Sequence, residues 1–256
     1  MKVLAIIITA YKIDSSLIAT LENFKNQKIP ENWKVKIYVG VDDCKESASI
    51  LDYHDLSYYI SDKNVGTYVL FNSLMLEAKK EGFDALLRFD WDDVPLDNFL
   101  YNGLKSLEQY PFLRASYIKT DVNFSVLNNK ISTAFGIFFI TNELLSKIGG
   151  FNEHRIECDY DLVERLSILG HTSIDLSRFL TKIRIHGLKY SFRSSLPIFY
   201  RRIRENSLSS SPKTGHGTSY RNQIKKDLEQ RRLQGKLFIE DIRVTNLEFI
   251  KNGRQN

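Results

Sequence analysis

Residues 86–93 read Leu86-Leu87-Arg88-Phe89-Asp90-Trp91-Asp92-Asp93, an apolar run that ends in three carboxylates within four positions. The apolar run predicts a buried strand, so the carboxylates fall at its carboxyl end. Two carboxylates about 4 Å apart repel by about 4 kcal/mol at a surface-like dielectric, which makes such a cluster costly without a divalent cation. Mg²⁺ and Mn²⁺ prefer oxygen ligands and often share their coordination shell with substrate phosphates. The alternative is a solvated acidic turn, which the nearby Pro95 favours.

The segments before this cluster alternate between strand and helix patterns. Residues 3–8 form a continuous apolar run that predicts a central strand buried on both faces. Residues 35–41 alternate apolar and polar side chains and end at Asp42-Asp43, so a second acidic pair also follows a strand. The other expected elements are helices at 17–24, 46–53 and 67–80 and strands at 56–60 and 85–89. This alternation predicts an α/β sheet that binds ligands beyond the carboxyl ends of its strands.

The pattern after the cluster predicts that the second half of the sheet is mixed. The expected helices there span 97–107, 142–148 and 159–169. Strands are expected at 112–118 and 131–141, joined by a polar connection at 121–130, and at 172–176 and 180–185. His186 follows the last of these strands.

Composition describes a globular chain of 256 residues, with 43% hydrophobic and 26% charged residues. Its two cysteines, Cys44 and Cys158, lie far apart and predict neither a disulfide framework nor a zinc site. The apolar run near the N-terminus is too short for a membrane span and lacks a signal-peptide cleavage region, which indicates a cytoplasmic protein.

Charge is distributed unevenly along the chain. Residues 1–186 hold 21 basic and 25 acidic side chains, whereas residues 187–256 hold 15 basic and 6 acidic ones. We therefore divide the chain near residue 190 into a catalytic domain, 1–190, and a basic, mainly helical extension, 191–256, with a helix at 220–234. Such a tail suits anionic lipid at the inner face of the membrane or nucleic acid. It could equally be a solvated helix that lies against the acidic body.

Six landmarks together resemble the family 2 glycosyltransferases of the GT-A fold, over roughly residues 3–186. The first three are Ile8-Thr9-Ala10-Tyr11, Val39-Gly40-Val41-Asp42-Asp43 and Asn64-Val65-Gly66 with Asn72. The others are Phe89-Asp90-Trp91-Asp92-Asp93, Ile148-Gly149-Gly150-Phe151-Asn152-Glu153 and Cys158-Asp159-Tyr160-Asp161-Leu162 with Arg165 and Gly170. Cys158 stands where the family has Glu. The resemblance implies a Rossmann-like mixed central sheet flanked by helices.

The resemblance also implies roles for individual residues. Asp159 would be the catalytic base, and Asp92 with His186 would bind a divalent metal, Mn²⁺ or Mg²⁺. The nucleotide-sugar contacts would be Thr9, Tyr11, Asp42, Asp43, Asn64, Gly66, Arg88, Asp90 and Asp93. Simpler roles stay open for three residues. His186 could be purely structural, Asp159 could cap the N-terminus of a helix, and Asp161 could be an acidic side chain in the first turn of that helix. Trp91 could stack on a sugar or pack in the core.

We therefore expect a metal-dependent, inverting glycosyltransferase that uses a nucleotide-sugar, with UDP-sugars as the leading class. The expected acceptor is a saccharide or a lipid-linked saccharide, and the alternative acceptor is a modified base in DNA, bound through the basic tail. Cys158 leaves a second alternative, a non-catalytic nucleotide- or sugar-binding module. A nucleotidyltransferase ranks lower, because residues 9–14 contain no glycine for a phosphate-binding loop.

Overall fold

The computed structural model describes residues 1–171, 197–204, 211–239 and 242–252. Its strands are β1 Lys2–Ala10, β2 Trp33–Val41, β3 Tyr58–Ser61, β4 Ala85–Asp90, β5 Val94–Pro95, β6 Phe112–Thr120, β7 Val126–Thr141, β8 Ile198–Arg202 and β9 Leu247–Ile250. Its helices are α1 Ser16–Lys25, α2 Lys45–Tyr53, α3 Thr67–Glu81, α4 Phe99–Leu107, α5 Asn142–Ile148, α6 Cys158–Ile168 and α8 Ser219–Leu233. None of the helices in these ranges combines the length and apolar composition that a membrane crossing needs.

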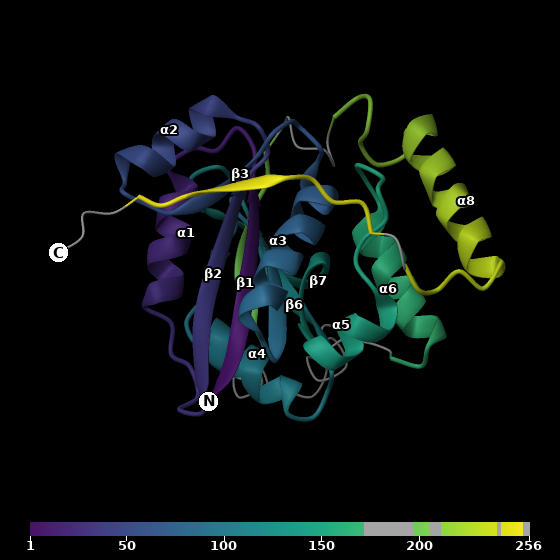
Figure 1. The fold of residues 1–256 in the computed structure, drawn as a ribbon, viewed down its shortest axis with the longest axis horizontal. Coiled ribbons are helices and arrows are strands. Elements are labelled where there is room, and N and C mark those ends of the chain that lie inside the picture. The colour runs from purple at the N-terminus through teal and green to yellow at the C-terminus, as the bar shows by residue number, and fades with distance from the viewer. Residues whose placement is uncertain (172–196, 205–210, 240–241, 253–256) are drawn as a thin grey trace.

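These strands form one mixed sheet in the order β5-β8-β6-β7-β4-β1-β2-β3-β9. The central strands β4, β1, β2 and β3 are parallel to one another, while β7 runs antiparallel to β4 and β6. Helices cover both faces, with α1 and α2 on one side and α3, α5 and α6 on the other (Figure 1). The predicted mixed α/β sheet flanked by helices is confirmed.

The alternation along β1 explains why its sequence is apolar without interruption. Leu4, Ile6 and Ile8 belong to the hydrophobic cluster beneath α1 and α4. Ala5 and Ile7 belong to the cluster beneath α3, α5 and α6. Because successive strand residues face opposite sides, a strand covered on both faces needs apolar residues at every position.

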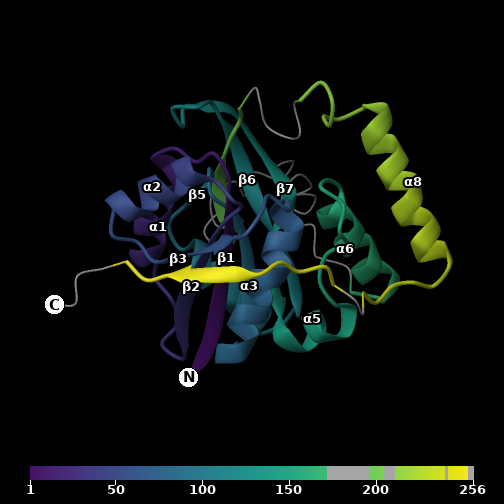
Figure 2. The same ribbon diagram turned by 45° about the horizontal axis from the view of Figure 1, so that its top comes forward.

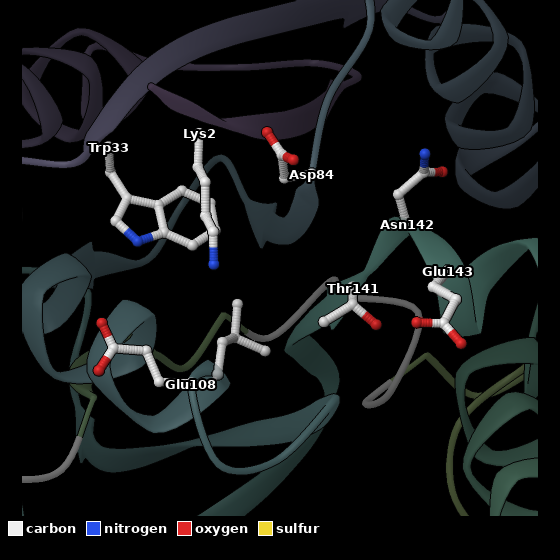
Figure 3. A pocket seen from close by; sticks show the side chains of 8 residues that line it. Lys2, Trp33, Asp84, Glu108, Thr141, Asn142 and Glu143 are labelled. Atoms are coloured by element: carbon white, nitrogen blue, oxygen red, sulfur yellow. The ribbon is translucent and has the colours of Figure 1, made fainter.

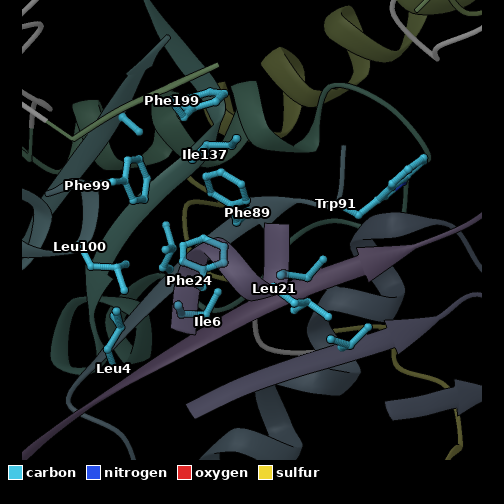
Figure 4. Packing of buried hydrophobic residues seen from close by; sticks show 14 of the residues in the cluster. Leu4, Ile6, Leu21, Phe24, Phe89, Trp91, Phe99, Leu100, Ile137 and Phe199 are labelled. Carbon is cyan, nitrogen blue, oxygen red and sulfur yellow. The ribbon is translucent and has the colours of Figure 1, made fainter. Parts of the chain in front are cut away.

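Aromatic rings fill the first of these clusters (Figure 4). Phe89 of β4 has its ring centroid 4.9 Å from that of Phe24 and 5.6 Å from that of Phe199. Phe24 lies on α1 and Phe199 on β8, so the cluster joins elements from both ends of the chain. The strand that leads to the acidic cluster is therefore buried and packed in the core.

The segment after residue 190 contributes strands as well as a helix. β8 pairs parallel with β6, and β9 pairs antiparallel with β3 at the far edge of the sheet. The helix α8 packs on the body through Ile224 and Leu228 against Ile156, and it lies outside α6 (Figure 2). The predicted boundary near 190 and the strands predicted at 172–176 and 180–185 lie outside the described residues. Part of the connection expected at 121–130 is strand, because β7 begins at Val126.

A substitution at Gly103 of α4 would test how tightly this core is packed. A Cβ added at Gly103 would lie 2.3 Å from Cζ of the buried Phe139 ring. Alanine favours the helix by about 1 kcal/mol, but overpacking in a core costs about 1–3 kcal/mol. We expect Gly103→Ala to lower the free energy of unfolding by about 1–2 kcal/mol in urea denaturation. Lys105→Ala, on the exposed side of the same helix, should change it by less than about 0.5 kcal/mol. A Gly103→Ala protein as stable as the wild type would contradict this packing.

Candidate functional site

Thr9 connects the two acidic groups across the sheet. Its register partners are Gly40 of β2 on one side and Asp90 of β4 on the other. The backbone N–H of Asp42 donates to the Ala10 carbonyl at 3.0 Å. Both acidic groups therefore lie at one edge of the sheet, beyond the carboxyl ends of β1, β2 and β4, where α/β sheets bind ligands.

The carboxylate of Asp42 holds the loop at residues 64–66. Its Oδ1 accepts the N–H of Val65 at 2.7 Å, and its Oδ2 accepts the N–H of Gly66 at 2.8 Å and Nδ2 of Asn64 at 3.0 Å. Burial raises the pKa of Asp42, and the two backbone N–H groups oppose this rise. Gly66 has φ 88°, a conformation that favours glycine. Three predicted nucleotide contacts, Asp42, Asn64 and Gly66, thus form one hydrogen-bonded unit.

The other predicted nucleotide contacts of this region lie around that unit. Thr9 Oγ1 is 2.5 Å from Oγ1 of Thr67. Asp43 is exposed, with φ 45°. Tyr11 is 45% exposed, and the Lys12 ammonium lies 5.5 Å from its ring centroid. An exposed aromatic ring beside a polar loop suits a planar ligand.

Two carboxylates of the acidic cluster form ion pairs with arginines. Arg88 Nη2 lies 3.0 Å from Asp90 Oδ1, and Arg204 Nη2 lies 2.7 Å from Asp92 Oδ2. Burial raises the pKa of Asp92, the Arg204 charge opposes the rise, and the Asp90 charge adds to it. These cations offset the cost of placing neighbouring carboxylates at a partly buried site.

Asp93 is the buried member of the cluster. Its carboxylate accepts the backbone N–H of Arg202 at 3.1 Å. Burial raises the pKa of Asp93 well above its usual range, and the charges of Asp92 and Asp90 add to the rise, whereas Arg201 opposes it. Asp93 therefore joins the loop after β4 to β8, and its predicted contact with the donor stays a prediction.

Trp91 packs in the core, which decides between its two expected roles. Its side chain belongs to the hydrophobic cluster beneath α1 and α4. The guanidinium of Arg204 lies 4.6 Å from the Trp91 ring and that of Arg202 lies 5.5 Å from it. Arg202 also pairs with Asp14, with Nη2 3.0 Å from Oδ2. The indole thus supports two of the arginines that approach the acidic cluster.

Arg88 connects the acidic cluster to Asp159. Besides its ion pair with Asp90, Arg88 donates through Nη1 to the Gly136 carbonyl. A Cβ at Gly136 would lie 2.6 Å from Arg88 Nη1 and 3.1 Å from Asp159 Oδ2, so a larger residue there would have to displace the end of the Arg88 side chain. Gly136 lies on β7, whose pairing with β6 shifts register between Arg114 and Ser116. Such irregularities bend a strand and change the direction of its side chains, and they are common beside functional sites.

Asp159 is held by hydrogen bonds to its Oδ1. The Tyr68 hydroxyl donates to this oxygen at 2.9 Å, and the N–H of Tyr160 donates at 3.0 Å. Burial raises the pKa of Tyr68 well above its usual range, and the Asp159 charge adds to the rise, so the phenol stays protonated and donates. The N-cap of α6 is Glu157 rather than Asp159. The geometry thus presents a fixed carboxylate that can accept a proton.

Asp161 is the centre of a buried charge network rather than a simple first-turn helix charge. Arg165 Nε lies 2.9 Å from its Oδ2, and Arg232 Nη1 lies 2.7 Å from its Oδ1. Arg165 also donates to the carbonyls of Ile148 and Gly150, at 2.7 and 2.9 Å. The network ties α6, the glycine turn after α5 and the tail helix α8 together.

A second charge pair fastens α8 beside the first. Arg221 Nη1 lies 2.6 Å from Glu157 Oε1, and both side chains are buried. With the pairs of Arg202, Arg204 and Arg232, these contacts place several basic groups of the tail on carboxylates of the body. The expected alternative of a tail that lies against the acidic body agrees with these contacts.

Cys158 occupies a site that suits a neutral thiol. Its Sγ lies 3.2 Å from the His154 carbonyl oxygen and 3.4 Å from that of Asn152. Burial raises the pKa of the Cys158 thiol, and the negative charges of Asp159 and Asp161 add to the rise. The thiol can donate to these carbonyl groups, whereas a carboxylate at this position would face them with negative charge.

Four site residues were not predicted from the sequence: Tyr68, Arg201, Arg202 and Arg204. The run Arg201-Arg202-Ile203-Arg204 follows an apolar segment, which is the one available signal for the arginines. Tyr68 gives no signal of its own, because it lies within an amphipathic helix. His186, the second predicted metal ligand, lies outside the described residues.

The carboxylates of the cluster partly fit a divalent metal. Across the described ranges, no three His, Cys, Asp or Glu side chains are grouped to hold a metal ion by themselves. Asp90 and Asp92 nevertheless offer hard oxygen ligands. Asp92 already pairs with one cation, the Arg204 guanidinium. Two carboxylates suit a metal whose other ligands are substrate phosphates and water.

A separate cavity of about 370 Å³, whose lining side chains are drawn in Figure 3, lies at the opposite end of the sheet. Lys2 and Trp33, at the amino ends of β1 and β2, line it together with Asp84 and Asn142. Because parallel strands bind ligands at their carboxyl ends, this cavity is not part of the candidate site.

No family model matches the chain, and no curated protein sequence matches it either. Solved structures do resemble it. The mannosyltransferase PcManGT from Pyrobaculum calidifontis, in complex with GDP-Man and Mn²⁺, aligns with a TM-score of 0.52 and 12% identity. That alignment covers 80% of this chain but only 58% of the mannosyltransferase. Residues 1–349 of S. aureus TarS, in complex with UDP, align with a TM-score of 0.51 and 13% identity, covering 91% of this chain and 72% of that one.

At identities this low, the similarity concerns the fold. The chain has a glycosyltransferase fold, and it spans little more than half of the mannosyltransferase that it resembles. Fold alone does not determine function, which depends on the residues of the site.

Proposed function

We propose that this chain is a metal-dependent glycosyltransferase that moves a sugar from a nucleotide-sugar to an acceptor hydroxyl with inversion. The observation that carries the proposal is the convergence of two groups at one edge of the sheet. Asp90 and Asp92 supply oxygen ligands there, and Arg88, which pairs with Asp90, lies beside Gly136 together with Asp159, which Tyr68 orients. A donor site and a proton acceptor are the two parts that glycosyl transfer requires.

Asp159 would act as the base. As the acceptor oxygen bonds to the anomeric carbon, the bond from that carbon to the phosphate oxygen breaks and its electron pair leaves with the nucleoside diphosphate. The acceptor proton passes to the Asp159 carboxylate. Tyr68 donates to Oδ1 of Asp159 and so fixes the orientation of the carboxylate. A positioned general base contributes about 100- to 10,000-fold to a rate.

Asp92, with Asp90, would hold Mn²⁺ or Mg²⁺. When bound, the metal would neutralise the diphosphate of the donor. Support comes from the mannosyltransferase of the same fold, which binds GDP-Man with Mn²⁺. Asp42, Asp43, Thr9, Tyr11 and the loop at 64–66 would bind the nucleoside, and UDP-sugars remain the leading donor class. TarS, which has the same fold, binds UDP.

Buried guanidinium groups support an anionic ligand at this edge. Among the described residues, Nε of Arg88 and Nε of Arg202 are buried and have no hydrogen-bond acceptor. Buried polar groups without partners are rare and call for an explanation. The phosphate oxygens of a donor are acceptors of the kind that such donors bind.

For the acceptor, we favour a saccharide or a lipid-linked saccharide over a base in DNA. The DNA alternative rests on the basic tail, but Arg221 and Arg232 of α8 are paired with buried carboxylates of the body. A guanidinium held in this way contributes less to phosphate binding. The thiol of Cys158 is accommodated by carbonyl groups, so its presence does not favour a non-catalytic module.

Asp92→Asn tests the donor site. The amide is a poor metal ligand, so we expect Mn²⁺-dependent binding of a nucleotide-sugar to weaken by about 10- to 100-fold in equilibrium dialysis. Asp97→Asn removes an exposed carboxylate five residues away and should leave binding unchanged. Equal Mn²⁺-dependent affinity in wild type and Asp92→Asn would contradict the proposed metal role.

A further inference from the structure

Arg204 occupies an unusual position at the acidic cluster. It follows β8 directly, its Nη2 lies 2.7 Å from Asp92 Oδ2, and its guanidinium lies over the Trp91 ring. The residue that is proposed to bind metal is therefore already paired with a cation that belongs to the chain. A metal ion and this guanidinium would repel each other strongly at such a short separation.

Arg204 is also the most exposed of three arginines that pair with carboxylates here. Its side chain is 33% exposed, compared with 7% for Arg88 and 6% for Arg202. Arg88 also donates to the Gly136 carbonyl, and the backbone N–H of Arg202 donates to Asp93. A partly exposed side chain has room to change its position, so Arg204 is the arginine of the three that can leave its carboxylate with the least rearrangement of its surroundings.

We propose that Arg204 is a positioning residue that exchanges partners: it holds Asp92 in the donor-free protein, is displaced by the divalent cation and then binds the diphosphate of the donor. This inference rests on the proposed function. The planar guanidinium fork matches phosphate oxygens, which it can bind in a bidentate manner. The Trp91 ring gives the released guanidinium a surface beside the site.

The exchange makes the binding of metal and nucleotide interdependent. Metal alone has to break the pair between Asp92 and the Arg204 guanidinium. Metal together with a nucleoside diphosphate supplies a new partner for it. Wild type should therefore bind Mn²⁺ weakly alone and more tightly with UDP or GDP, which is a positive coupling between two ligands.

Arg204→Ala should change two quantities in opposite directions: the affinity for Mn²⁺ alone should rise, and the enhancement of that affinity by a nucleotide should fall. Without its competitor, Asp92 should bind Mn²⁺ alone about tenfold more tightly, as isothermal titration calorimetry would measure. The same variant should lose most of the enhancement of Mn²⁺ affinity by UDP or GDP. Arg204→Gln, which keeps a polar but shorter side chain without the charge, should behave in the same way. Thermal melts establish that each variant is folded.

Lys36→Ala is the matched control. It also removes a positive charge from an ion pair, that of Lys36 with Glu81 at 2.7 Å, outside the candidate site. Its Mn²⁺ affinity and its coupling should equal those of wild type. A similar gain in affinity in Lys36→Ala would assign the effect to net charge and overturn the inference.

The remaining outcomes separate this inference from the proposed function. If wild type binds Mn²⁺ with UDP or GDP but Arg204→Ala binds Mn²⁺ alone no more tightly, the partner exchange is wrong and the proposed function stands. If wild type binds neither nucleotide in the presence of Mn²⁺, both are overturned.

Discussion

Replacing Asp159 with Asn is expected to lower the rate of sugar transfer by about 100- to 10,000-fold, the contribution of a positioned general base. The amide keeps the shape of the side chain and can still accept from the Tyr68 hydroxyl, so the site should keep its geometry. It cannot take a proton from the acceptor. Initial rates of nucleoside diphosphate release, measured with saccharide acceptors, would show the loss.

Donor affinity should not change in Asp159→Asn, because the nucleotide and metal positions lie at β1, β2 and β4. Glu153→Gln is the control: it changes an exposed carboxylate in the connection between α5 and α6, one that pairs with Arg243, and should leave the rate unaltered. A fully active Asp159→Asn enzyme would rule out Asp159 as the base. A loss of both rate and donor affinity would instead place Asp159 in the donor site.

Replacing Asp161 with Asn is expected to lower the free energy of unfolding by about 3 kcal/mol or more. Its side chain is 2% exposed and that of Arg165 is 1% exposed, so the change leaves a buried guanidinium without its carboxylate. Arg232 loses the same partner, which weakens the attachment of α8 to α6. Urea denaturation followed by far-UV circular dichroism measures the effect.

Glu143→Gln provides the comparison for Asp161→Asn. Glu143 pairs with Lys147 four residues later at 2.6 Å, but both side chains are well exposed. Exposed pairs of this kind contribute less than about 1 kcal/mol. Equal losses in the two variants would contradict the buried network as the reason for the stability of this region.

Much of the body could be predicted from the sequence, because its pattern is local. The uninterrupted apolar run of β1, for example, predicts a central strand that is covered by helices on both faces, as it is in the structure. Asp42 and Asp90 follow strands that are parallel, so the rule for carboxyl ends places them at one edge before any side-chain position is known.

The partners of these carboxylates could not be predicted, because they come from distant parts of the chain. The backbone N–H of Arg202 meets a carboxylate 109 residues earlier in the sequence, and this contact depends on β8 pairing with β6. The positive net charge of residues 187–256 predicts a polyanion partner if the contacts of the tail with the body are ignored. Once it is folded on the body, several of its arginines neutralise the acidic site.

Asp42 shows a second limit of reasoning from sequence. A carboxylate after a strand predicts a ligand contact, but the oxygens of Asp42 accept from the loop at 64–66. Such a carboxylate can shape a binding loop as well as touch a ligand. Position in the sequence does not distinguish these roles, because the hydrogen bonds join residues more than 20 positions apart.

The edge formed by β1, β2 and β4 is proposed to bind a nucleotide-sugar with a divalent metal. Thermal unfolding of the full chain against a panel of UDP- and GDP-sugars, each with Mn²⁺ and with a chelator, tests it most directly. We expect one nucleotide class to raise Tm by about 5–10 °C at a hundredfold excess over Kd, and the chelator to abolish the shift. No shift with any nucleotide-sugar in the presence of Mn²⁺ would contradict the claim.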